Sequence, residues 1–346
     1  MKAYDHSQDY IGAIMLPLRL VAGWLFFSAF WRRIVLVPEK HVMDSAQWLG
    51  HKINTFYPHS NGFFKSMLGQ FLENPDAMNV FTWVFTLSEL VAGLLLIFGF
   101  LSRLTGLLLL GLAVGLMHTA GWLGPTCLDE WQISSLLTAI GLVITLFGSG
   151  KYSLDGWFNR KNFSFTQKGW WKILTDPLTN AGGKWFRRVI YSLSLVVFIY
   201  VLAMNQVHHG GVWGKLHNYS KKPDIQVTEY TYVNDSTFRV NLYRDKGPET
   251  HGTFLIQLDV MDAQGDTLHT FRAENLKSLS DSAIENQYIN TIHTGPHSLV
   301  VPLGAKGGVT FQLPEGKRLD PDENYSLVFT GISGKQYRNA GSGSRP

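Results

Sequence analysis

Val80-FTWVFTLSELVAGLLLIFGFLSRLTGLLLLGLAVGLMHTAGW-Leu123 consists of two long apolar runs. An α-helix needs about 20 predominantly apolar residues to cross the hydrocarbon core of a membrane, and each run has about that length. Only Leu101-Ser-Arg103 separates the runs, and so short a link makes two helices antiparallel neighbours. The stretch therefore predicts a transmembrane hairpin, with one helix from about Val80 to Phe100 and the next from about Leu104 to Leu123.

Three further apolar runs flank this hairpin, from about Ile11 to Phe30, from about Trp131 to Phe147 and from about Val189 to Met204. Charged residues make up only 16% of the 346 residues, against about 25% in ordinary soluble proteins. Small residues along the runs would let helices approach closely in lipid. They are Gly93, Gly99, Gly106, Gly111 and Gly115. We predict a four-helix transmembrane bundle followed by a fifth transmembrane helix.

The segment 151–188 sets the predicted orientation because it is strongly basic and its only acidic residues are Asp155 and Asp176. Loops rich in Lys and Arg stay in the cytoplasm. The N-terminus and Arg103 then also face the cytoplasm, whereas residues 31–79, 123–130 and everything after 205 face outside. The sequence thus predicts a multi-pass inner-membrane protein with a periplasmic C-terminal domain. Aromatic residues of the basic loop indicate a segment at the membrane interface. They are Trp157, Trp170, Trp171 and Trp185.

The C-terminal part alternates apolar and polar residues with period two, which is typical of β-strands. Such runs begin at Ile225, Thr237 and Thr253, and Asp262-AQG-Asp266 reads as a hairpin turn before a further strand. About seven short strands predict a β-sandwich.

The predicted domains follow from these patterns. They are a transmembrane bundle at 1–150 with an outer loop at 31–79, a basic cytoplasmic loop at 151–188, a fifth transmembrane helix at 189–205 and a β-domain at 206–338. The glycine–serine tail 341–346 is set aside as a linker remnant.

Cys127 is the single cysteine of the chain. One cysteine excludes an intramolecular disulfide framework and any cysteine-based zinc or iron–sulfur site. Cys127 is either a thiolate nucleophile or an inert buried thiol, and His118 lies close enough in sequence to assist it. The net charge of +4 includes no basic stripe of the kind that tracks phosphates, so nucleic acid is not a predicted partner.

Charged residues inside apolar helices are costly and mark functional sites. Glu89 would relay a proton or hold a polar headgroup, and Arg19 would pair with it or contact a quinone. The alternative for both is a structural ion pair or a hydrogen bond between helices. Arg32 and Arg33 stand at the outer end of the first run, where basic residues are disfavoured. With Lys40 and His41 they would form an anion site, the alternative being arginines that snorkel to the lipid boundary.

His208-HGGVWGKL-His217 follows the last apolar run. His208 and His209 would belong to a ligand-binding loop over the outer mouth of the bundle, or to a glycine-rich linker. No carboxylate or cysteine completes a metal-ligand pattern there, so no metal site is predicted. Trp24, Trp122 and Trp131 would pack a quinone ring, or anchor helices at the membrane interface.

Several of these segments resemble one known superfamily. Leu18-RLVAGWLFFSAFWR-Arg33, Glu89-LVAGLLLIFGFLS-Arg103 and Gly148-SGKYSL-Asp155 resemble DoxX-like membrane bundles. Cys127-LDEW-Gln132 points to DoxD within that superfamily, and Gly210-GVWGKLH-Asn218 resembles DoxA. The chain thus resembles a fused DoxD–DoxA protein across nearly its whole length.

The resemblance implies a thiosulfate:quinone oxidoreductase, in which two thiosulfates couple to tetrathionate and a membrane quinone, ubiquinone or menaquinone, takes the electrons. A cationic site at the membrane surface beside an apolar bundle fits a dianionic substrate and a lipid acceptor. The sequence leaves the oligomeric state open, with a homodimer as one option. The main alternative is a non-catalytic accessory or assembly protein whose β-domain binds a partner. A sulfur-anion transporter would need a polar path through the bundle, and too few polar residues lie in the runs for one.

Overall fold

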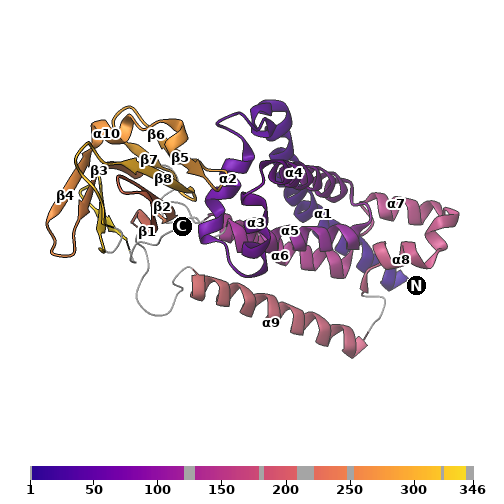
Figure 1. Cartoon of the computed structure of the whole chain (residues 1–346). Coiled ribbons are helices and arrows are strands. Elements are labelled where there is room, and N and C mark those ends of the chain that lie inside the picture. Colours follow the sequence, from indigo (N-terminus) through magenta and orange to yellow (C-terminus); the bar gives the residue numbers. More distant parts are fainter. Residues whose placement is uncertain are drawn as a thin grey trace. The chain divides into compact units, whose positions relative to one another are not determined.

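The computed structural model describes residues 2–120, 129–178, 183–208, 222–247, 253–320 and 323–339 (Figure 1). The chain divides into two compact units. The helical unit comprises Met1–Trp48, Asn79–Trp122 and Leu128–Asn218. The sandwich unit comprises Leu49–Met78, Leu123–Cys127 and Tyr219–Pro346. Residues from the predicted outer loop therefore group with the β-domain.

The predicted membrane bundle is confirmed in the helical unit. Its long helices are α1 (Lys2–Trp31), α4 (Pro75–Phe98), α5 (Ser102–Thr119), α6 (Asp129–Phe147) and α9 (Gly183–His208). Among the described residues, four segments are long and apolar enough to cross a membrane: Gly12–Leu36, Pro75–Phe98, Ser102–Thr119 and Gly183–Val207. The apolar part of α6, Trp131–Phe147, is shorter. Five spans were predicted, and the fifth segment, Trp131–Phe147, has the predicted bounds but is shorter than the four candidate spans.

Glycines let two pairs of helices approach closely. A Cβ atom on Gly93 of α4 would lie 2.7 Å from the backbone nitrogen of Phe27 in α1, and one on Gly106 of α5 would lie 2.6 Å from the backbone nitrogen of Thr145 in α6. Small residues at these two crossings are therefore required by packing. Gly111 is different, because a Cβ there would meet no atom within 4 Å.

The predicted cytoplasmic loop contains α7 (Leu154–Lys161), the 3₁₀ turn η4 (Ser164–Gln167) and α8 (Gly169–Thr175). Trp171 of α8 is only 1% exposed, and its indole nitrogen donates to Asn159 Oδ1 at 2.8 Å. Trp171 is thus a core residue of this segment and not an interface anchor. The other three tryptophans of the predicted group, Trp157, Trp170 and Trp185, are exposed.

The sandwich unit confirms the predicted antiparallel β-domain. Its described strands are β1 (Asp224–Asn234), β2 (Thr237–Lys246), β3 (Thr253–Met261), β4 (Thr267–Arg272), β5 (Ile284–Asn286), β6 (His293–Thr294), β7 (Leu299–Val301), β8 (Lys306–Gln312), β9 (Ser326–Gly331) and β10 (Gln336–Arg338). The short helix α10 (Ala273–Lys277) follows β4. The short strands β5, β6 and β10 and the helix α10 were not predicted, because runs of two to five residues show too little periodicity to be recognised.

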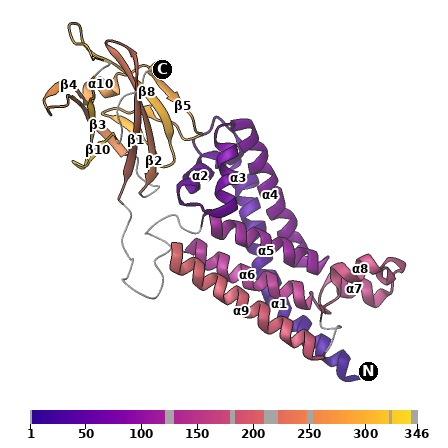
Figure 2. The ribbon, with the colours of Figure 1, turned by 60° about the horizontal axis from the view of Figure 1, so that its bottom comes forward.

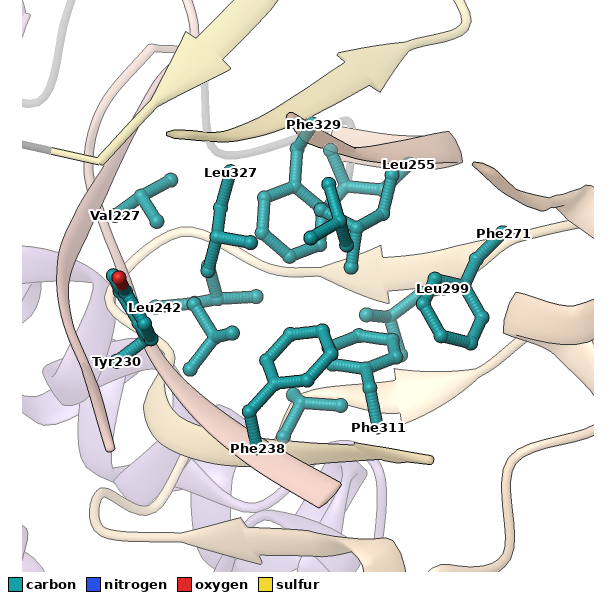
Figure 3. Close-up of a cluster of buried hydrophobic side chains, with 14 of the residues drawn as sticks. Val227, Tyr230, Phe238, Leu242, Leu255, Phe271, Leu299, Phe311, Leu327 and Phe329 are labelled. Atoms are coloured by element: carbon teal, nitrogen blue, oxygen red, sulfur yellow. The ribbon is translucent and has the colours of Figure 1, made fainter. Parts of the chain in front are cut away.

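The strands form two sheets with one apolar core. One sheet has the order β1-β2-β8-β5, and the other has the order β10-β9-β3-β7-β6, with β4 also paired to β3. Inward-facing residues of both sheets meet in the cluster shown in Figure 3. Phe238 and Phe311 stack there at 5.6 Å between ring centroids. The turn predicted at Asp262–Asp266 closes the β3–β4 hairpin, with the Asp262 nitrogen donating to the Asp266 carbonyl at 2.9 Å.

The predicted outer loop is largely folded. After α1 come a π-helical turn, η1 (Arg32–Leu36), and a 3₁₀ turn, η2 (Pro38–His41), both in the helical unit. Then α2 (Leu49–Phe56), η3 (Tyr57–His59) and α3 (Gly62–Leu72) belong to the sandwich unit. This segment is consequently a part of the β-domain's fold as well as a connection between two membrane helices.

Asn54 of α2 joins this segment to the β-strands. Its side chain is fully buried, donates to the Gly304 carbonyl at 3.0 Å and accepts from the Asn290 backbone nitrogen at 2.7 Å. Near it, the rings of Tyr57 and Tyr288 meet edge to face at 5.8 Å. Two buried backbone groups of the β-domain therefore depend on one side chain of α2.

Replacing Asn54 by alanine leaves both backbone groups buried without partners, at a cost of about 3 kcal/mol. We expect amide protection in α2 of the full-length chain to fall by about a hundredfold, measured by hydrogen exchange and mass spectrometry. Lys52→Ala, an exposed neighbour on α2, is the control. Equal exchange in the two variants would show that Asn54 does not hold α2 in place.

Candidate active site

The π-helical turn η1, just after α1, and the middle of α4 carry a buried ion pair. The π-helical turn η1 directs Arg33 back toward α4, where its Nη1 donates to Glu89 Oε2. The two side chains are only 13% and 6% exposed, and the Arg33 guanidinium lies 5.2 Å from the ring centroid of Phe85. Two charges buried away from water are stable only while each compensates the charge of the other. The structure therefore joins two residues that the sequence presented as separate candidates.

His41 lies against the same face of α4. Its Nε2 is 3.1 Å from Thr86 Oγ1, and its ring centroid is 4.3 Å from that of Trp83. Burial and the nearby Arg33 charge lower the pKa of His41 below its usual value, so the ring is neutral near pH 7. Its Nδ1 is buried and has no hydrogen-bond partner among the residues that the structure describes. A neutral imidazole nitrogen beside a buried arginine can bind a polar ligand.

Trp83 and Thr86 were not recognised from the sequence. Trp83, Thr86 and Glu89 recur every three residues, which places them on one face of α4. This spacing was the available signal, but it points to a shared site only once the neighbouring η1 and η2 turns are known.

Arg19 does not pair with Glu89. Fourteen residues separate Arg19 from Arg33, which is about 20 Å along a helix. Arg19 is fully buried, and its Nη2 donates to the Tyr152 carbonyl at 2.7 Å. The close packing of Gly99, where a Cβ would lie 1.7 Å from Arg19 Nη1, shows how tightly the guanidinium is enclosed. The predicted partnership of Arg19 and Glu89 was therefore wrong.

Asp155 organises the same end of the bundle as Arg19. Its carboxylate accepts from the backbone nitrogens of Leu101 at 2.9 Å and Ser102 at 2.8 Å, and from the Ser102 hydroxyl. Burial raises the pKa of Asp155, although these hydrogen bonds oppose the rise. Asp155 thus satisfies the first backbone N–H groups of α5. A cavity of about 450 Å³ lies beside Asp155, and none of the predicted site residues lines that cavity.

A second cluster lies where α5, α6 and α9 meet. Met117 of α5 and Met204 of α9 are buried together, and Trp131 of α6 and Tyr200 of α9 pack against them. The ring centroid of His118 is 6.0 Å from that of Tyr200. The structure therefore brings the predicted residues His118 and Trp131 to one place and adds Tyr200 to them.

The remaining predicted residues have varied positions. Arg32 is exposed and Lys40 is half-buried. Trp24 is 60% exposed on α1, with its ring 5.9 Å from that of Phe27. His208 is the last residue of α9, but its side chain is outside the described part of the structure. Cys127, Trp122 and His209, like the tail 341–346, lie outside the described residues.

These features define an integral membrane protein with an ion-paired site buried in a helical bundle and a β-sandwich unit. Family models identify it further. Residues 14–180 match the family described as TQO small subunit DoxD, and residues 208–340 match TQO small subunit DoxA. The chain is a fused DoxD–DoxA protein and belongs to the thiosulfate:quinone oxidoreductase (TQO) family. It is therefore an oxidoreductase, as the resemblance implied. Residues 181–207 belong to neither match.

Proposed function

We propose that this chain oxidises thiosulfate to tetrathionate at the outer face of the inner membrane and passes the electrons to a membrane quinone. The observation that carries the proposal is the buried Arg33–Glu89 pair with His41 beside it. The family accounts for the thiosulfate donor and the quinone acceptor. The Arg33–Glu89 pair is itself neutral, so the net positive charge that a sulfur dianion requires comes from Arg32 and Lys40 in the adjoining η1 and η2 turns. In this orientation the N-terminus is cytoplasmic and the β-domain is periplasmic.

The reaction balances as two half-reactions. Two thiosulfate dianions join through their outer sulfur atoms to form the tetrathionate dianion and release two electrons. The quinone, when bound, accepts these two electrons together with two protons. The protein must therefore hold a dianion, exclude competing water and place a proton donor near the quinone oxygens.

Arg33 is the central residue for substrate in this proposal. Its guanidinium offers planar donors suited to a sulfonate group, and Glu89 holds the guanidinium in a fixed position. Arg32, Lys40 and His41 add positive charge or hydrogen bonds at the rim, and His208 and His209 close over the substrate. The Nδ1 of His41 is the one group in this set that the described structure shows as buried and unsatisfied.

Cys127 supplies the covalent step. Its thiolate forms an S–S bond with the outer sulfur of a first thiosulfate, and two electrons leave toward the quinone. The outer sulfur of a second thiosulfate then attacks the adduct sulfur that is bonded to Cys127 Sγ. This step forms tetrathionate and releases the Cys127 thiolate. Charge is conserved in each step, and no oxidant other than the quinone is required.

The groups proposed around the quinone lie on the helical bundle. His118 or Glu89 handles the quinone protons. Trp24, Trp122 and Trp131 offer aromatic surfaces, and Arg19 offers a buried cation. Trp131 and His118 both pack beside Tyr200.

Purified chain in detergent should reduce decylubiquinone or a menaquinone analogue only when thiosulfate is present. We expect one tetrathionate for each quinol, measured by absorbance of the quinone and chromatography of the sulfur anions. Sulfate or sulfite formed in place of tetrathionate would contradict the proposed product. A folded sample that reduces none of the quinones would contradict the proposed reaction.

A further inference from the structure

Helix α9 packs on the bundle through a narrow face. Near its start, the ring of Phe186 meets that of Phe147 in α6 at 5.9 Å, and near its end Tyr200 and Met204 meet α5 and α6. Figure 2 shows α9 beside α6. Most other apolar side chains of α9 are exposed, including Tyr191 at 70%. In a membrane these exposed faces contact lipid, so a lipid-soluble molecule can reach the edge of the α9 contact.

The contact near the end of α9 has an unusual composition for packing between membrane helices. Small residues commonly form such contacts, whereas here two methionines, a tryptophan, a histidine and a tyrosine converge from three helices. Methionine side chains are flexible and polarizable and can adapt to a flat ring. Ser135 lies one turn after Trp131, and its hydroxyl donates to the Trp131 carbonyl at 2.7 Å. The same hydroxyl oxygen is 3.9 Å from Met117 Sδ.

Tyr200 carries the decisive observation. Its hydroxyl oxygen is buried and has no hydrogen-bond partner within the described parts of the chain. A buried tyrosine hydroxyl nearly always finds a partner, because leaving it unsatisfied costs free energy. The Tyr200 hydroxyl can donate to an acceptor that enters an apolar, aromatic site open to lipid. A quinone carbonyl is an acceptor of this kind.

We infer that α9 and the adjoining ends of α5 and α6 form the binding site for the quinone ring, with the Tyr200 hydroxyl donating to one quinone carbonyl. Trp131, Met117 and Met204 pack against the ring, and His118 lies next to Tyr200. This inference rests on the proposed function for the identity of the acceptor. It assigns a role to the helix that neither family match covers, and it moves the quinone away from Trp24 and Arg19.

The first test uses Tyr200→Phe in the full-length chain, with Tyr191→Phe on the lipid-exposed side of α9 as the matched control. Removing one neutral hydrogen bond should raise the KM for decylubiquinone about tenfold in Tyr200→Phe. The KM for thiosulfate should change less than twofold, and a loss of packing would not produce this split. Equal quinone KM values in the two variants would overturn the inference.

The second test measures binding without turnover. A photoreactive azidoquinone should label wild-type peptides from residues 197–207 or 115–137, and excess decylubiquinone should prevent the labelling. Labelling confined to α1 near Trp24 would overturn the inference. If wild-type protein shows this labelling but no thiosulfate-dependent reduction, the proposed function fails and the quinone site stands. If reduction proceeds and the label lies elsewhere, the reverse holds.

Discussion

Replacing Arg33 by methionine is expected to lower the stability of the helical unit by about 3–5 kcal/mol, because Glu89 is left as an uncompensated buried charge. The same change should slow thiosulfate-dependent quinone reduction by about a hundredfold or more, the usual effect of losing a donor that stabilises developing or bound anionic charge. The rate is measured with decylubiquinone, and the stability by thermal unfolding in detergent. Arg187→Met, at an exposed position of α9, is the control and should shift stability by no more than about 0.5 kcal/mol.

The double variant Arg33→Met with Glu89→Met separates stability from function. Replacing a whole buried pair by apolar side chains is often neutral or stabilising, so unfolding should return close to that of the wild type. Activity should stay low, since no guanidinium remains to hold the substrate. Recovery of activity together with stability would show that Arg33 and Glu89 only hold η1 against α4. Loss of both properties in the double variant would point to a packing defect, and the anion role would then lose its support.

Replacing Cys127 by serine or alanine is expected to reduce turnover by about a thousandfold or more, the order seen when a covalent nucleophile is removed. A serine hydroxyl has nearly the size of the thiol, but it stays protonated at neutral pH and cannot form the S–S bond that the scheme requires. Because Cys127 is the single cysteine, no other thiol of the chain can replace it. The rate is measured in the same quinone assay.

A direct measurement complements the Cys127 variants. Wild-type protein treated with thiosulfate and quinone, then quenched in acid, should gain the mass of one bound thiosulfate, and both variants should gain none. Prior alkylation of Cys127 should block turnover as fully as the substitutions do. Near-wild-type rates in either variant would remove the covalent scheme, while the family assignment would remain. Full activity with no mass gain would likewise rule out an accumulating adduct.

The membrane helices could be predicted closely because one physical requirement decides them. The run from Gly12 to Leu36 and the run from Gly183 to Val207 must be apolar to lie in lipid, and this shows directly in composition. The main strands were equally visible, since β1 and β2 bury alternate side chains and leave the others in water. The segments quoted as resembling DoxD and DoxA also lie within the matched family regions.

The candidate site was only partly visible. Five of the residues that the structure places in the two clusters were recognised individually as candidates from the sequence: Glu89, Arg33, His41, His118 and Trp131. Their grouping did not, because Arg33 and Glu89 are 56 residues apart and meet only through the π-helical turn after α1. Sequence spacing cannot show such a turn. Tyr200 drew no attention, since a tyrosine in an apolar helix is ordinary until its hydroxyl is found buried without a partner.

By itself, the sequence determined that this chain has a lipid-embedded helical part and a β-domain, because hydrophobicity and its period act locally along the chain. Only the tertiary structure decided which charges neutralise each other, that α2 belongs to the β-domain, and that Trp171 is core and not an interface anchor. Those outcomes depend on which side chains are brought together from distant segments. The free energy of burying Arg33, Asn54 or Tyr200 is set by partners that no local pattern contains.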